Sequence, residues 1–224
     1  MPVALLVGFL VTWWLGLIVG ALVAAATAFW VWNRAATLPE RAYGVGEAHH
    51  ASMPTVENVM DGICLANGII EPRIALVDTA ATNAALLGRS ETDLVFVITT
   101  GLLDSIDRMG VEAVVGHLLA RDHDEVETRT LCASMPLWIP AALCSLALPS
   151  DVSRIEQDQR GLTYTRFPPA LAKTLEMMLQ KSTAVPGTGR VDDPLWLAPA
   201  MAGGATDPDA TERIEDRIEV LREL

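Results

Sequence analysis

The sequence has 224 residues, 51% of them hydrophobic, and its 28 acidic and 16 basic side chains give a net charge of −12. This length accommodates one globular domain and an appendage, but not a second full domain. The acidic balance argues against nucleic acid as a partner, because phosphate binding needs a cationic surface. Three cysteines, Cys64, Cys132 and Cys144, form no C-x-x-C pair. We therefore expect these cysteines to be small apolar residues of the interior. Their spacing indicates neither a disulfide framework nor a thiolate zinc site.

Residues 3–32 carry no charge. At about 1.5 Å per residue, a helix of this length crosses a hydrocarbon core of about 30 Å. The start lacks the cationic residues of a cleavable signal, and the apolar run is far longer than a signal needs. Trp13-Trp14 and Trp30-Trp32 are spaced as two interfacial belts, which favours one helix over a hairpin. We therefore predict a retained transmembrane anchor over residues 1–33.

Charge around this anchor predicts its orientation. Arg34 and Arg41 follow it, whereas no Lys or Arg precedes it. The positive-inside rule then places the anchor in the cell membrane, with the C-terminal domain in the cytoplasm.

Small residues recur every fourth position of the anchor. Such a stripe allows close contact with another helix, from a different membrane protein or from a second copy of this chain. The alternative is that Gly and Ala are simply abundant here. The stripe consists of Gly8, Thr12, Gly16, Gly20, Ala24 and Ala28.

The rest of the chain predicts short elements. Residues 34–53 are polar and irregular and are interpreted as a tether. Thr55 is a plausible N-cap for a helix that stops at Asn67-Gly68. Runs rich in β-branched residues predict strands, and apolar residues at helical spacing predict helices. The strands are expected at 74–77 and 94–98, the further helices at 111–121, 151–180 and 209–223, and an extended loop at 182–208.

Residues 131–148 form a second uncharged run, which Pro136 and Pro140 interrupt. Its length is borderline for a membrane span, and its prolines make a straight helix costly. A re-entrant or membrane-surface segment and a buried core helix therefore compete with a true crossing.

Four blocks, in order from about residue 57 to the end, resemble the membrane-bound zinc metallopeptidases of the HtpX type. Together they span about three quarters of the chain. The resemblance implies an α+β, mainly helical fold, with a gluzincin-like metallopeptidase domain and a small β-sheet over residues 54–224. The blocks are Asn67-Gly68 with 72–78 and Asn83-Ala84 to Gly88; 97–103 with 111–117; Asp158 with 165–168 and 171–176; and Thr206-Asp207-Pro208 with Arg213-Ile214.

Activity in this family depends on H-E-x-x-H, in which two histidines on one helix face bind zinc and the glutamate is the general base. Here the motif reads His117-Leu118-Leu119-Ala120-Arg121. Only the first ligand position is kept. Leu118 cannot accept a proton, and Arg121 has no free lone pair and repels a metal cation.

The resemblance also identifies the remaining site positions. Counting back from Asp158, the third-ligand position, a glutamate in the family, is Arg154. The histidine of the family's T-H-P is Asp207, and Arg213 belongs to its closing R-I pattern. A crossing at 131–148 would put His117 and Arg154 on opposite sides of the membrane, so we prefer a segment that does not cross.

Neighbouring residues do not complete a zinc site if the helix continues past His117. Six residues correspond to about 240° of helix, so His117 and His123 diverge, and Asp124 lies about 10.5 Å along the axis from His117. We interpret His49, His50 and His123 as exposed polar residues. We expect Arg121 and Arg154 to converge, with Asp158 pairing with one of them so that a guanidinium replaces the metal structurally. The alternative is that both arginines point to solvent.

These substitutions favour an HtpX-like pseudopeptidase that binds, regulates or scaffolds another membrane protein, with no cofactor expected. The alternative is a zinc-dependent membrane metalloendopeptidase with non-standard ligands, in which His117 is the only ligand position of the family pattern that is kept. A third possibility is a partner that completes an active site in trans or chaperones an active relative. The bilayer is a partner in each case.

Overall fold

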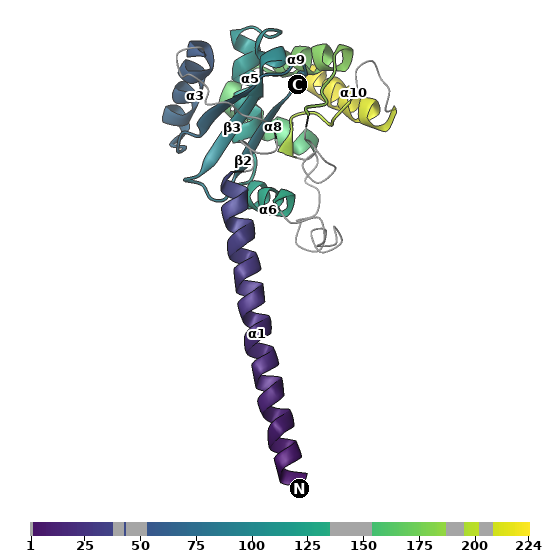
Figure 1. Ribbon diagram of the computed structural model, residues 1–224. Helices are drawn as coiled ribbons and strands as arrows, with labels where there is room; N and C mark the ends of the chain where they lie inside the picture. Colours follow the sequence, from purple (N-terminus) through teal and green to yellow (C-terminus); the bar gives the residue numbers. More distant parts are fainter. Residues whose placement is uncertain (1, 38–42, 44–52, 135–153, 187–194, 202–207) are drawn as a thin grey trace.

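The computed structural model describes residues 2–37, 43, 53–134, 154–186, 195–201 and 208–224. Its first element, helix α1 (Pro2–Ala36), projects away from the rest of the molecule (Figure 1). Residues Trp13–Ala35 are long and apolar enough to cross a membrane. The helix continues three residues past the predicted end of the anchor, because nothing in Asn33-Arg34-Ala35-Ala36 interrupts a helix.

The end of α1 contacts the domain directly. Val31 and Ala35 are buried, and α1 packs against helix α6 (His123–Ala133). The guanidinium of Arg89 lies 5.2 Å from the ring centroid of Trp32, which is a cation–π contact. The membrane helix and the domain are therefore joined by packing as well as by the chain.

Three strands form one small mixed sheet: β1 (Arg73–Val77), β2 (Ala84–Gly88) and β3 (Leu94–Thr99), in the order β1-β3-β2. β1 runs parallel and β2 antiparallel to β3. The predicted strands at 74–77 and 94–98 are confirmed within a residue. β2 was not predicted as a strand, because its alanines, leucines and glycine have no strong strand preference. Its five residues are all buried, so packing outweighs propensity there.

Helix ends explain the remaining differences from the sequence predictions. Pro54 begins α3, and the Thr55 side chain does not cap it; Gly68 ends α3 as predicted, in the left-handed region with φ of 67°. The single helix expected at 151–180 is two helices, because Arg166 has a positive φ of 54° and Pro168 begins a new helix. The helices besides α1 and α6 are α3 (Pro54–Asn67), α4 (Thr100–Leu103), α5 (Arg108–Leu119), α8 (Arg154–Thr165), α9 (Pro168–Gln180) and α10 (Pro208–Glu223).

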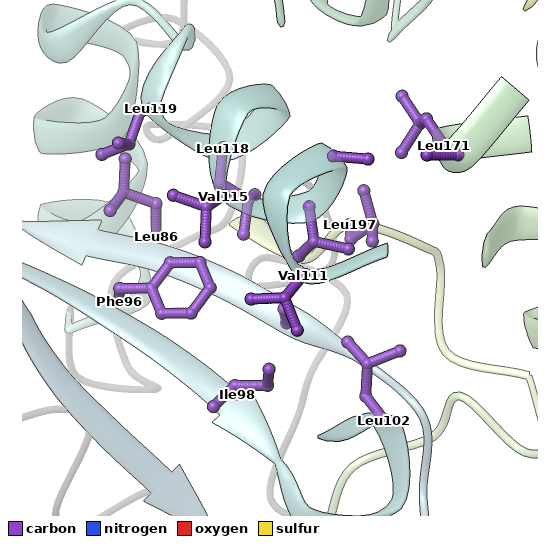
Figure 2. Close-up of a cluster of buried hydrophobic side chains, with 14 of the residues drawn as sticks. Leu86, Phe96, Ile98, Leu102, Val111, Val115, Leu118, Leu119, Leu171 and Leu197 are labelled. Carbon is purple, nitrogen blue, oxygen red and sulfur yellow. The ribbon is translucent and has the colours of Figure 1, made fainter. Parts of the chain in front are cut away.

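The main core lies where α5 packs on one face of the sheet. Figure 2 shows Phe96 and Ile98 of β3 beneath Val111 and Val115 of α5. Helix α9 adds Leu171 to the same cluster. The architecture is α+β and mainly helical with a small sheet, as predicted. Its consequence for function is that α5, which carries His117 and Leu118 of the H-E-x-x-H position, is fixed against the sheet.

Several predictions fall outside the described residues. These concern most of the 131–148 segment, most of the tether, His49, His50, Cys144 and Asp207. Cys64 and Cys132 are buried, as expected of interior residues. Part of the predicted loop at 182–208 is not an exposed connection, because residues 195–199 are buried.

Candidate functional site

His117 lies in the last turn of α5 and is buried, with 1% of its surface exposed. Its Nδ1 lies 2.7 Å from Oδ1 of Asp158 in α8, although the contact does not have the geometry of an aligned hydrogen bond. Its Nε2 is buried and has no hydrogen-bond partner in the described part of the chain. Asp158 therefore orients the imidazole and leaves Nε2 available.

Asp158 is held from its other side by Arg217 of α10. Arg217 Nε donates to Oδ2 at 2.7 Å and Nη2 donates to Oδ1 at 2.9 Å, so the pair is bidentate. Both side chains are 2% exposed. Removal from water strengthens such a charge-assisted pair and also makes its loss expensive.

Sequence reasoning missed Arg217, although a signal was present. The Arg-Ile pair occurs twice, at 213–214 and 217–218. Buried Ile214, Ile218 and Leu221 define one face of α10, and Arg217 belongs to that face. A charged residue in an apolar helical stripe indicates a buried ion pair. Arg213 is exposed and donates to the carbonyl of Asp209, away from the site.

Arg121 and Arg154 converge on one backbone segment. Arg121 donates to the carbonyls of Leu195, at 2.5 Å, and Trp196, at 3.0 Å. Arg154 donates to the carbonyls of Trp196, at 3.1 Å, and Leu197, at 3.0 Å. Neither arginine points simply to solvent. The expected pairing of Asp158 with one of them differs from the structure, in which Arg217 takes that carboxylate.

Burial and charge determine which of these groups are ionised. Burial lowers the pKa of His117 to about 4, with Arg121 and Arg217 adding to the effect and Asp158 opposing it. Burial, then Arg154 and Arg217, lower the pKa of Arg121 to about 9. Burial alone would raise the pKa of Asp158, but Arg217 and His117 hold it well below its usual range. At neutral pH the site contains a neutral imidazole, a carboxylate and guanidinium cations.

The sequence is similar to curated proteins named Protease HtpX homolog. One from Dictyoglomus thermophilum is 27% identical over 80% of this chain and 72% of its own length. One from Dictyoglomus turgidum is 23% identical over 93% of this chain and 82% of its own length, and one from Acidiphilium cryptum is 29% identical over 55% and 45%. The chain is an HtpX-like protein. No family model and no solved structure matches it.

Zinc, which this family typically binds, does not fit the residues of this HtpX-like site. Of the three expected ligand positions only His117 can offer a lone pair, since Arg121 and Arg154 are donors. Leu118, at the general-base position, is fully buried in the apolar core (Figure 2). Within the described ranges no group of three His, Cys, Asp or Glu residues could hold a metal ion. The described residues of the site form an ion pair and bind backbone carbonyls.

The neighbouring residues that were considered as replacement ligands lie after a break in the helix. α5 ends at Leu119 and α6 begins at His123, with Asp122 as the N-cap that accepts from the Asp124 amide. The geometry expected for a continuous helix therefore does not apply. His123 is half-buried and not fully exposed as predicted. Glu125, also on α6, pairs with Arg129 at 2.8 Å.

Proposed function

We propose that this HtpX-like chain is a membrane-anchored pseudopeptidase that acts as a binding, regulatory or scaffolding subunit for another membrane protein. One observation carries the proposal: Arg121 and Arg154, at two ligand positions, both donate to the carbonyl of Trp196. These guanidinium groups bind protein carbonyls at the positions where zinc ligands are needed. The chain then contributes a stable domain at the membrane and no hydrolysis.

Electrostatics supports this proposal. A divalent cation near His117 would face Arg121, Arg154 and Arg217, and guanidinium groups supply no lone pair. At about 4 Å, two unit charges repel by about 4 kcal/mol at an effective dielectric constant of 20. One neutral imidazole does not offset repulsion from several such groups.

A specific observation favours the second candidate, a zinc endopeptidase with non-standard ligands. Metal-binding histidines commonly place a carboxylate at one ring nitrogen and the metal at the other. His117 has Asp158 at Nδ1 and a buried Nε2 without a partner among the described residues. This arrangement suits a metal ligand, so the zinc content of the protein decides between the two candidates.

Partner and orientation are part of the proposal. We propose that the small-residue stripe of α1 contacts a helix of the partner or of a second copy, with the domain in the cytoplasm. At Gly16 and Gly20 no atom beyond the adjoining residues and backbone of α1 itself lies within 4 Å of where a Cβ would be, so a neighbouring helix could approach them. Arg34 at the end of α1 agrees with the positive-inside rule.

Elemental analysis of the full-length protein, purified in mild detergent, tests the proposal. We expect far less than one zinc per chain. The matched variant is Arg121→His with Arg154→Glu, which returns two ligands of the family pattern; we expect it to gain zinc and to lose it again when His117→Ala is added. One zinc per chain in the unmodified protein, removed by His117→Ala alone, would establish the enzyme instead.

A further inference from the structure

The edge of the sheet next to the arginines is occupied by the chain itself. β2 is an edge strand, and such a strand presents unpaired N–H and C=O groups to any extended chain that approaches. Trp196 forms an antiparallel bridge with Ala85 of β2. The amide of Leu197 donates to the carbonyl of Ala84 at 2.7 Å. Residues 195–198, named the edge segment below, therefore meet the edge of β2 through one bridge and the hydrogen bond beside it, without forming a further strand.

The edge segment is as buried as the core. None of its four residues is more than 1% exposed. Trp196 packs with Leu87 and Val97 in the cluster on one side of the sheet, whereas Leu197 packs with Phe96 in the main core. Leu195 belongs to the same cluster as Trp196, and Ala198 to the same core as Leu197, so the edge segment passes from one cluster to the other between residues 196 and 197.

The contacts that hold the edge segment from the other side are made to its backbone. Arg121 reaches the carbonyls of residues 195 and 196, Arg154 those of 196 and 197, and Arg217 that of 197, at 2.9 Å. The Asn83 side chain donates to the Ala198 carbonyl at 2.9 Å and accepts from the Ala198 amide at 3.2 Å. Backbone contacts of this kind bind an extended peptide with little regard for its sequence.

We propose that the β2 edge, Asn83 and the three guanidinium groups form a site for an extended peptide, and that the edge segment is its internal ligand, which excludes other peptides. The proposal deepens the proposed function, on which it rests, because guanidinium groups and not a metal receive the peptide carbonyls. The site is closed by the chain's own edge segment. A partner that uses this site must displace the edge segment.

Hydrogen exchange, measured by mass spectrometry on the full-length protein in detergent, tests whether the guanidinium groups hold the edge segment in place. Arg154→Gln removes two carbonyl contacts, and we expect amide exchange in the edge segment and in β2 to become at least tenfold faster. The control is Arg160→Gln, which removes an exposed arginine from the same helix. We expect exchange in the control to match the unmodified protein. Unchanged exchange of the edge segment in Arg154→Gln would overturn the proposal.

Peptide capture tests whether the site accepts an extended chain in trans. The probe is a fluorescein-labelled synthetic peptide of residues 195–201. Leu197→Pro in the protein deletes the amide that donates to Ala84, which weakens the internal ligand and leaves the receiving groups unchanged. We expect this variant to bind the probe at least tenfold more tightly than the unmodified protein, and to bind a probe carrying the same proline at least tenfold more weakly.

A second variant guards against misfolding of Leu197→Pro. Ala198→Pro deletes only the longer hydrogen bond, from the Ala198 amide to Asn83. We therefore expect its affinity for the probe to lie between the affinities of the unmodified protein and of Leu197→Pro. If either folded variant fails to bind the probe better than the unmodified protein does, the proposal is wrong. Zinc content does not enter these measurements, so their failure is distinct from failure of the pseudopeptidase assignment.

Discussion

Gly161 of α8 lies directly against the backbone of His117 in α5. A Cβ added at Gly161 would be 2.7 Å from the Cα of His117 and 3.1 Å from its nitrogen. Only glycine permits this approach. The two helices cross closely here, and the crossing places Asp158, one turn earlier in α8, beside the imidazole.

Gly161→Ala is expected to destabilise the protein by about 1–3 kcal/mol, because a methyl group must displace backbone atoms of α5. The matched control is Gly62→Ala in α3, where no atom beyond the adjoining residues and backbone of the helix itself lies within 4 Å of the added Cβ. That change should stabilise the helix by about 0.5–1 kcal/mol. Urea unfolding of both variants in detergent, followed by tryptophan fluorescence, measures the difference. Equal stability of the two variants would contradict the close crossing.

Asp158→Asn is expected to cost about 3–5 kcal/mol, because it leaves the buried Arg217 cation without its carboxylate. The control, Glu156→Gln, neutralises an exposed carboxylate two residues away on the same helix and should change stability by less than about 0.5 kcal/mol. The same urea titration applies. A neutral effect of Asp158→Asn would show that the ion pair has little structural importance.

Stability should rise with pH between about 4 and 6.5 because of His117. Its folded-state pKa is lowered to about 4 from 6.5, so the unfolded chain binds the extra proton in this interval. The contribution is fully present above pH 6.5 and is lost as the pH falls toward 4, by about 3 kcal/mol in total. Asp158 adds a further loss of stability only when the pH falls below the ordinary pKa of an aspartate, because its folded-state pKa is lowered too.

Unfolding free energies at several pH values between 4 and 7 measure this dependence. His117→Gln should flatten the profile over the interval, whereas His123→Gln, which changes a half-buried histidine outside the site, should keep its slope. An unchanged slope in His117→Gln would assign the pH dependence to other groups.

Chelation gives a separate prediction about the structural role of the arginines. Exhaustive dialysis against a chelator should leave the melting temperature of the unmodified protein unchanged, because ion pairs and carbonyl contacts hold the site. The Arg121→His, Arg154→Glu variant should instead lose melting temperature when its zinc is removed. A large chelator effect on the unmodified protein would mean that a metal supports the fold.

Periodicity predicted most of the fold, and failed where packing overrides propensity. The strands rich in valine and isoleucine were found from sequence, whereas β2 was missed because Ala84 and Ala85 form a strand only through burial and pairing with β3. The edge segment was missed for the same reason. Its hydrogen bonds to Asn83 and Ala84 join residues more than a hundred positions apart, and no local pattern encodes them.

The sequence predicted which ligand positions of the family are absent from the site, but not which contacts occupy their place. The residues at the H-E-x-x-H position follow from the sequence alone, and so does the convergence of Arg121 and Arg154 once the fold is assumed. The partner of Asp158 depends on which face of α10 is buried. The sequence predicted that Asp158 pairs with Arg121 or Arg154, but the side chain that reaches this carboxylate is that of Arg217 in α10.

The stripe of small residues predicts that bulk on one face of α1 disrupts association. Ala24→Leu places a large side chain on the stripe, and Ala26→Leu makes the same change about 200° around the helix. We expect Ala24→Leu to weaken association with the partner or second copy by roughly 5- to 30-fold, the equivalent of about 1–2 kcal/mol, and Ala26→Leu to have little effect. Co-purification from mild detergent and the molar mass of the complex by light scattering measure it. If both variants associate as the unmodified protein does, the contact with other membrane proteins is not made through this face, and the domain must provide it.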